Sequence, residues 1–338
     1  MDIPLLFAAV TAFAVVVYVL ADGFDLGVGI LFLIAPREID RDRMMQSIEP
    51  VWDANETWLV MGGLLLYAGF PAGYYILMPA FYLPIMLMLF SLIFRGISFA
   101  FRFQPGPFRR FWDFAFALGS LFATLSQGLI LGGIIAGVPV ANGAFAGGPL
   151  SFFNIEGVLC GLGLVAGYSL LGACWLVRKT EDGTQIFARE IGRTALIATT
   201  IMLAAVSGWT ALIHGDVAAR WFGWPNIAFL APVPLVTAGI IVALWQSLWG
   251  ERDARPFVLA LALFLLGFVG LVVSLWPYVV RPDLTIWDAA SDRSTQIFAG
   301  VGVVIIMPIV LAYQAHAYWV FRGKTALESA DAYGSSEG

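Results

Sequence analysis

The sequence predicts an all-α, polytopic membrane protein, and three observations lead to that prediction. Of the 338 residues, 60% are hydrophobic and only 12% are charged, which is about half the charged fraction of a typical soluble domain. The mean hydropathy is +0.86. Apolar runs long enough to cross a bilayer, which takes about 20 residues, recur along the whole chain. These features exclude a soluble domain, and no basic run in the sequence suggests nucleic-acid binding.

Nine segments have the length and composition of a transmembrane helix. We place them at approximately 5–34, 51–70, 75–101, 112–136, 153–177, 194–213, 227–249, 257–279 and 297–321. No basic region or cleavage pattern surrounds the first, so we expect it to be retained rather than removed as a signal peptide. The nine form one predicted membrane domain over 1–325. The acidic, Ser/Gly-rich residues 326–338 are predicted to be a disordered cytoplasmic tail.

Basic residues predict the orientation, because cytoplasmic loops carry an excess of Lys and Arg. With the N-terminus outside, the inner loops and the C-terminal end hold 14 of the 18 basic residues. The outer loops hold three, and Arg95 lies inside the third helix. We therefore predict nine spans with the N-terminus outside and the C-terminus in the cytoplasm.

Acidic residues interrupt the first two apolar segments. Asp22 and Asp25 lie in the cytoplasmic half of the first, and Asp53 and Glu56 lie in the first turns of the second. A charged side chain inside a bilayer costs several kcal/mol, about 2.5–3.5 even on insertion scales, and usually marks a functional path or a buried pair. The predicted topology brings both acidic pairs to similar depth on consecutive helices. Arg95, near the cytoplasmic end of the third helix, is the candidate charge partner.

Two interpretations of these acids remain open. In the functional one, the carboxylates of one wet groove relay protons inward from the cytoplasm. In the structural one, Asp25 pairs with Arg95, while Asp53 and Glu56 interact with the positive end of a helix dipole. Trp52 and Trp58 flank the second pair and are interpreted first as interfacial belt residues, with shaping of the groove entrance as the alternative.

Glycines surround the first acidic pair and predict close helix packing. Gly23, Gly27 and Gly29 fall within seven residues, and the first two have the spacing of a small-xxx-small interface. We expect another helix backbone to approach the first helix here.

The sequence is poorly equipped to bind haem or metal. Its two histidines, His214 and His316, lie near opposite faces of the predicted membrane domain, whereas haem iron needs axial ligands such as His, Met or Cys. Cys160 and Cys174 share one helix about 21 Å apart, too far for a disulfide. No phosphate-binding loop, Cys-x-x-Cys or nucleophile elbow is present, so we predict no catalytic, metal or haem site in this chain.

Two long motifs carry a family resemblance. Asp22–Gly29 and Pro50–Val60 resemble subunit II of the cytochrome bd-type quinol oxidases, and shorter matches follow at Ile93–Gly96, Phe99–Arg102, Ser126–Gly128 and Leu284–Ala289. The resemblance extends from the first to the ninth predicted helix. Short outer loops make the sequence most similar to the cyanide-insensitive branch.

The resemblance implies a heterodimer in a bacterial inner membrane. Subunit I carries haems b and d and the quinol site, and the complex oxidises ubiquinol and reduces oxygen to water, electrogenically and without pumping. Subunit II would stabilise that partner and contribute to the cytoplasmic proton path. By position, Asp25 and Asp53 match the family's proton-path aspartates, with Glu56 in the same motif and Asp22 beside them.

The same resemblance implies further features of architecture and partners. The nine helices would form two four-helix bundles plus one peripheral helix. Membrane lipids, a structural quinone and a small accessory single-helix subunit are also compatible with it.

Two other functions are open on the residues alone. An ion-coupled secondary transporter uses a broken, acid-bearing helix near the membrane interior, although paired interruptions in two halves of the sequence are missing. A purely structural assembly subunit would use its acids only to pair with Arg95.

Overall fold

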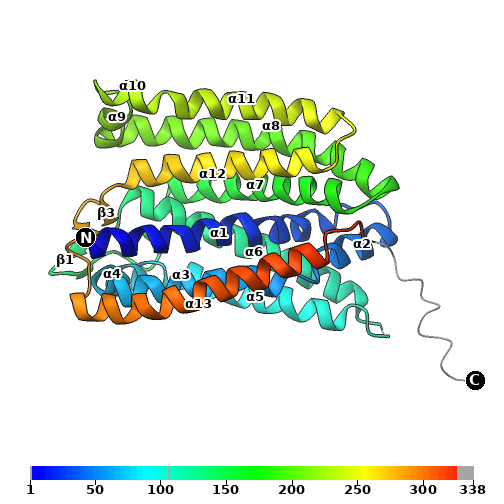
Figure 1. Ribbon diagram of the computed structural model, residues 1–338, viewed down its shortest axis with the longest axis horizontal. Coiled ribbons are helices and arrows are strands. Elements are labelled where there is room, and N and C mark those ends of the chain that lie inside the picture. The colour runs from blue at the N-terminus through cyan, green and yellow to red at the C-terminus, as the bar shows by residue number, and fades with distance from the viewer. Residues whose placement is uncertain (1, 106, 326–338) are drawn as a thin grey trace, which may run out of the picture.

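Long α-helices lying side by side make up most of the computed structural model, which describes residues 2–105 and 107–325 (Figure 1). The helices are α1 (Ile3–Phe32), α2 (Glu38–Ile48), α3 (Trp52–Gly69), α4 (Pro71–Ala80), α5 (Tyr82–Phe101), α6 (Arg109–Ala136), α7 (Ile155–Lys179), α8 (Asp182–Ile213), α9 (Gly215–Phe222), α10 (Asn226–Leu230), α11 (Pro232–Trp249), α12 (Ala254–Leu275) and α13 (Arg293–Val320). Two short antiparallel hairpins, β1–β2 (Val140–Ala141, Ala144–Phe145) and β3–β4 (Tyr278–Val280, Leu284–Thr285), lie in loops. The predicted tail at 326–338 lies outside the described residues.

Eight helices in the described part of the chain are long and apolar enough to cross a membrane: α1, α5, α6, α7, α8, α12, α13 and the 226–249 segment that contains α10 and α11. This confirms a multi-pass, all-α membrane protein. The predicted second span, α3, is not among the eight, because its 18 residues begin with Trp-Asp-Ala-Asn-Glu.

Two predicted segments differ clearly from the helices observed. The segment at 75–101 is not one helix, because it breaks at Phe81 between α4 and α5. Pro79 and Pro84 flank the break, and a proline has no N–H to donate and clashes with the carbonyl four residues earlier. By contrast, α8 begins at Asp182 rather than near 194, because its polar first turns bury Thr184 and Ala188 against neighbouring helices. The first segment is an unbroken helix through its acids.

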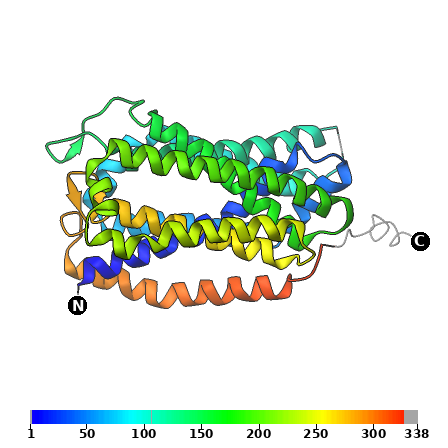
Figure 2. The same ribbon diagram turned by 90° about the horizontal axis from the view of Figure 1, so that it is seen from above.

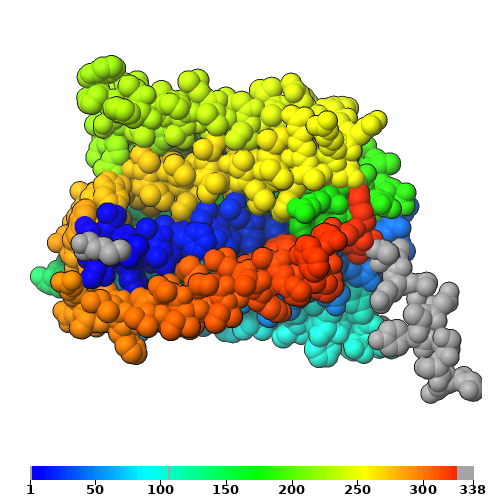
Figure 3. Space-filling model, viewed as in Figure 1, coloured from blue at the N-terminus to red at the C-terminus, as the bar shows by residue number. Residues whose placement is uncertain are grey.

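The first helix, α1, occupies the middle of the molecule. It packs on α3, α6 and α7, and it also contacts α12 and α13; on one face it runs between those last two helices (Figure 3). Gly27 faces the backbone of α7 at Tyr168 and Gly172 so closely that a Cβ would overlap it, whereas Gly29 faces the side chain of Ser120 of α6. The predicted approach of another helix backbone is confirmed at Gly27.

The basic loops gather at the end of the molecule opposite the N-terminus (Figures 1 and 2). Arg102 lies between two carboxylates there, donating from Nε to Asp113 and from Nη1 to Asp42, both at 2.6 Å. Ion pairs therefore tie α2, α5 and α6 together at this end.

The chain after α13 is fastened to the same end. Lys179, at the end of α7, donates from Nζ to the carbonyls of Phe321 and Gly323 at 2.5 and 2.6 Å. Lys324 donates in return to the carbonyl of Thr180 at 2.9 Å. These contacts hold the end of α13 against the α7–α8 connection.

Candidate functional site

A buried arginine joins two of the predicted acids. Arg95 of α5 is fully buried and donates from Nη1 to Asp22 Oδ1 of α1 at 2.6 Å and from Nη2 to Glu56 Oε2 of α3 at 2.7 Å. The Asp22 side chain is fully buried, whereas that of Glu56 is 27% exposed. Arg95, the candidate charge partner, therefore forms its ion pairs with Asp22 and Glu56.

Asp25 differs from Asp22 in its surroundings, although both are fully buried on α1. Its Oδ2 accepts a hydrogen bond from Asn55 Nδ2 of α3 at 2.7 Å. Its Oδ1 has no hydrogen-bond partner among the described residues. The structural interpretation in which Asp25 pairs with Arg95 is therefore wrong, because the guanidinium is occupied by Asp22 and Glu56.

The cluster holds more acid than base. Three carboxyl groups, those of Asp22, Asp25 and Glu56, surround one guanidinium. If all four groups were ionised, two negative charges would remain uncompensated in a largely buried site, which is energetically expensive. A site of this composition favours holding a proton, and a carboxyl with a single neutral partner is its best location.

Asp53 lies apart from this cluster. It is exposed on α3, and its carboxylate has no hydrogen-bond or ion-pair partner within the described ranges. The structure thus brings together Asp22 and Asp25 of α1 and Glu56 of α3. It leaves Asp53 on the exposed face of α3. Trp52 stacks on Phe99 with ring centroids 4.8 Å apart and packs beside Arg95.

Neutral side chains that the sequence interpretation missed complete the site. Asn55 Oδ1 accepts from Gln314 Nε2 at 2.7 Å and from the Tyr318 hydroxyl at 2.8 Å, both on α13. Trp58 Nε1 donates to Gln314 Oε1 at 2.8 Å. Trp58 is 1% exposed, so the interpretation of it as an interfacial belt residue is wrong. Amides carry no charge signal in a sequence, and the two helices they join are far apart in the chain.

A second polar row extends from the same site between α1, α6 and α7. The hydroxyl of Tyr168 donates to Gln127 Oε1 at 2.9 Å, and Gln127 Nε2 donates to the Tyr18 hydroxyl at 2.8 Å. Tyr18 lies one helical turn before Asp22 on α1. Gln127 belongs to the Ser126–Gly128 motif, which therefore has a place in the buried polar interior.

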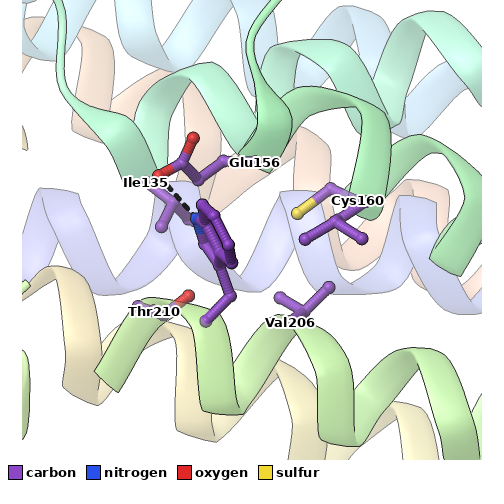
Figure 4. Close-up of a pocket in the computed structure, with 7 residues that line it drawn as sticks. Ile135, Glu156, Cys160, Val206 and Thr210 are labelled. Carbon is purple, nitrogen blue, oxygen red and sulfur yellow. Dashed lines mark hydrogen bonds between the residues drawn. The ribbon is translucent and has the colours of Figure 1, made fainter. Parts of the chain in front are cut away.

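The end of the molecule at which the N-terminus lies contains a narrow cavity between α6, α7 and α8 (Figure 4). It lies beside Glu156, Cys160 and Thr210 and is too narrow to hold a water molecule. Glu156 accepts a hydrogen bond from Trp209 Nε1 at 3.0 Å, and His214 Nε2 lies 3.7 Å from the same carboxylate oxygen. In the described part of the chain, no three His, Cys, Asp or Glu side chains gather to hold a metal ion.

Comparisons with known proteins agree along nearly the whole chain. The family model for cytochrome bd terminal oxidase subunit II matches residues 3–321. Subunit 2 of the cytochrome bd-I ubiquinol oxidase of Escherichia coli K12 is 27% identical over 350 residues, covering 92% of each chain. Subunit 2 of the cytochrome bd ubiquinol oxidase of Bacillus subtilis 168 is 24% identical over 315 residues, covering 90% of this chain and 91% of that one.

A solved structure supports the fold. A chain of the bd oxidase from Geobacillus thermodenitrificans superposes with a TM-score of 0.77 at 18% identity, covering 95% of this chain and 99% of that one.

Proposed function

This chain belongs to the family of cytochrome bd terminal oxidase subunit II, and from that premise we propose how it serves a ubiquinol oxidase of the bacterial inner membrane. Its partner is a haem-bearing subunit I, whose haems b and d would supply the reduction of oxygen to water. This chain stabilises that subunit and passes protons from the cytoplasmic side toward it. The charge imbalance around Arg95 is the observation that supports this role most strongly.

Asp25 is the residue that holds the transferred proton. Its carboxyl is buried and receives one hydrogen bond, from a neutral amide. Arg95 keeps Asp22 and Glu56 in place as its counter-ions, and Glu56, which is 27% exposed, provides the connection from the cluster to the surface of α3.

The exposed face of α3 is the proposed contact with subunit I. Asp53 lies on it together with Val60, Leu64 and Tyr67, whose exposed fractions are 70%, 58% and 59%. These positions recur every three or four residues and so form one apolar stripe along the helix. An ionisable carboxylate beside such a stripe is costly against lipid but useful against protein or water. Asp53 is therefore proposed to pass protons across the subunit interface.

The finer architecture completes the proposal. We add α3 as a ninth span to the eight described above. Its 18 residues measure about 27 Å, and it packs along α1 and α13. We propose that α1, α3, α5 and α6 form one four-helix group and α7, α8, α11 and α12 the other, with α13 peripheral; α1 and α6 also pack extensively on α7. The N-terminus is proposed to face outward and the clustered basic loops to face the cytoplasm.

A groove on α7 is a candidate place for bound lipid or quinone. The groove, of about 350 Å³ and lined by Phe153, Asn154, Ile155, Val158 and Leu159, opens on the outer half of α7, and its apolar lining suits an isoprenoid or acyl chain. A small accessory single-helix subunit and membership of the cyanide-insensitive branch remain predictions.

The two alternative functions lose support. A transporter of the kind considered uses broken helices, whereas α1 is continuous through Asp22 and Asp25. A purely structural role would pair every acid with Arg95, whereas Arg95 forms its ion pairs with Asp22 and Glu56 and not with Asp25.

Replacement of both aspartates tests the proposal. In the assembled oxidase, Asp25→Asn combined with Asp53→Asn should reduce quinol-driven oxygen consumption at least about tenfold, since positioned proton-transfer groups commonly contribute that much or more. The membrane potential formed in proteoliposomes should fall in parallel. Haem absorbance verifies that the complex has assembled.

The matched control is Asp283→Asn, which neutralises an exposed aspartate in the loop between β3 and β4. It should leave both measurements unchanged. Normal oxygen consumption and normal potential in the assembled double variant would refute the proton role.

A further inference from the structure

The hydrogen bonds around Asp25 have a direction that can be determined from one residue. The indole N–H of Trp58 can donate but cannot accept. It lies 2.8 Å from Oε1 of Gln314, and this contact requires the carbonyl end of that amide to face Trp58. The amide NH₂ of Gln314 must then point the opposite way.

Asn55 is oriented by what Gln314 presents to it. Gln314 Nε2 donates to Asn55 Oδ1 at 2.7 Å, and the Tyr318 hydroxyl donates to the same oxygen at 2.8 Å. A carbonyl oxygen has two lone pairs, and both are occupied by donors from α13. A flipped Asn55 would place its NH₂ against the NH₂ of Gln314, so the observed orientation is fixed.

The fixed orientation of the Asn55 amide then determines which oxygen of Asp25 carries the proton. Asn55 donates from Nδ2 to Asp25 Oδ2 at 2.7 Å. In a protonated carboxyl the carbonyl oxygen accepts more strongly than the hydroxyl, so the oxygen that receives this bond is the carbonyl one. The hydroxyl is therefore Oδ1, which is buried and has no partner among the described residues.

We propose that Trp58, Gln314 and Asn55 form a directional hydrogen-bond chain that makes Asp25 bind and release its proton at Oδ1. The inference rests on the proposed function of Asp25 and adds which oxygen acts and which residues select it. All four side chains are buried, with exposed fractions of 1%, 6%, 0% and 0% for Trp58, Gln314, Asn55 and Asp25. The three residues of the chain are positioning residues, because none of them carries the proton.

Loss of this hydrogen-bond chain should weaken the hydrogen bond that Asn55 donates to Oδ2 of Asp25. The ionised form of Asp25 would then be less favoured. Gln314→Leu leaves the Asn55 amide free to turn. Trp58→Phe keeps a large aromatic ring but removes the N–H that orients Gln314. Each should move the pH of half-maximal turnover of the assembled oxidase upward by about one unit, since a hydrogen bond to a charged group is worth about as much as such a shift.

Infrared difference spectroscopy gives a readout that a merely structural role would not change. A hydrogen bond to the carbonyl oxygen lowers the stretching frequency of a protonated carboxyl. The band that Asp25→Asn removes should therefore move to higher frequency in Gln314→Leu and in Trp58→Phe. Tyr318→Phe, which removes one hydroxyl, should produce a smaller change of the same sign.

Gln296→Leu is the matched control on the same helix. Gln296 is a buried glutamine of α13 that donates to the carbonyl of Gly69 at 3.2 Å, away from Asp25. It should leave the infrared band and the pH profile unchanged. Haem absorbance again selects assembled complexes, and Tyr318→Phe, which removes a single hydroxyl, provides the test if Gln314→Leu or Trp58→Phe does not assemble.

The outcomes separate the inference from the proposed function. An unchanged band and pH profile in the chain variants, with Asp25→Asn still defective, would overturn the inference alone. Normal turnover in Asp25→Asn would remove the proton role itself.

Discussion

The acidic side chains of this protein fall into two kinds according to their partners. Asp22 of α1 and Asp113 of α6 each accept from a fully buried guanidinium, so their charge is compensated within the fold. Asp25 and Asp53 have no such partner in the described structure, one being buried and the other exposed. The compensated acids join helices through ion pairs, whereas the two uncompensated acids are the ones to which we assign proton transfer.

Asp40 of α2 is a compensated acid outside the membrane spans, and its stability contribution should depend on pH. The hydrogen bonds from Arg37 lower the pKa of Asp40, and Thr184 of α8 donates to the same carboxylate at 2.7 Å. A lowered pKa in the folded state stabilises the fold above the unfolded value, about 3.9, and the stabilisation is lost as the pH falls through the folded value.

Asp40→Asn should therefore increase hydrogen exchange of α2 amides at pH 7, where the ion pair is complete. The difference from the parent protein should decrease as the pH falls below the unfolded pKa and through the lower folded pKa. A difference that is independent of pH would show that charge does not hold α2 against α8.

The acids and the arginine were predictable from the sequence, because a charge inside an apolar run is rare and costly. The partners of Arg95 were not, since three candidate acids lie within reach at similar depth. Asn55 and Gln314 could not be found either. They are neutral, and 259 residues separate them.

Helix packing depends on single positions where two backbones meet. Gly27 of α1 and Gly172 of α7 face each other, and a Cβ on either would overlap the opposite backbone. The local spacing of glycines predicted such an approach on α1, but the helix on the other side could be identified only from the fold. Helix ends were less predictable: prolines divided the segment at 75–101, and packing extended α8 beyond its apolar run.

Gly27→Ala should prevent normal packing of α1 on α7. The added methyl meets backbone, which cannot rotate away, and overpacking of this kind costs about 1–3 kcal/mol or more. Gly239→Ala is the matched control in α11, where an added Cβ meets nothing within 4 Å. Thermal inactivation of the purified complex should occur at lower temperature for the first variant and remain unchanged or rise slightly for the second.

At the scale of the whole molecule, basic residues are concentrated at one of the two ends. The basic loops form one end, with Arg102 and Lys179 buried in it, while the N-terminus and both β-hairpins lie at the other (Figure 1). The positive-inside rule predicts that the basic end faces the cytoplasm.

Cysteine labelling measures this orientation. The two native cysteines are buried, so background labelling should be low. Glu251→Cys places a thiol at the basic end and Asp283→Cys at the opposite one, both at exposed positions. A membrane-impermeant maleimide should label only Asp283→Cys in spheroplasts and only Glu251→Cys in inverted vesicles; the reverse pattern would invert the topology.

The position of α13 along the chain matters during protein synthesis. Gln314 follows Trp58 by 256 residues, so the ribosome must deliver every preceding helix before the last one can reach Asn55. Until then the acids of α1 are already in the membrane, and Arg95 can pair with Asp22, but Asn55 lacks its contacts with α13. The hydrogen bonds around Asn55 are therefore complete only after the final helix has been made and packed, so we expect a chain truncated before α13 to lack the proposed proton site.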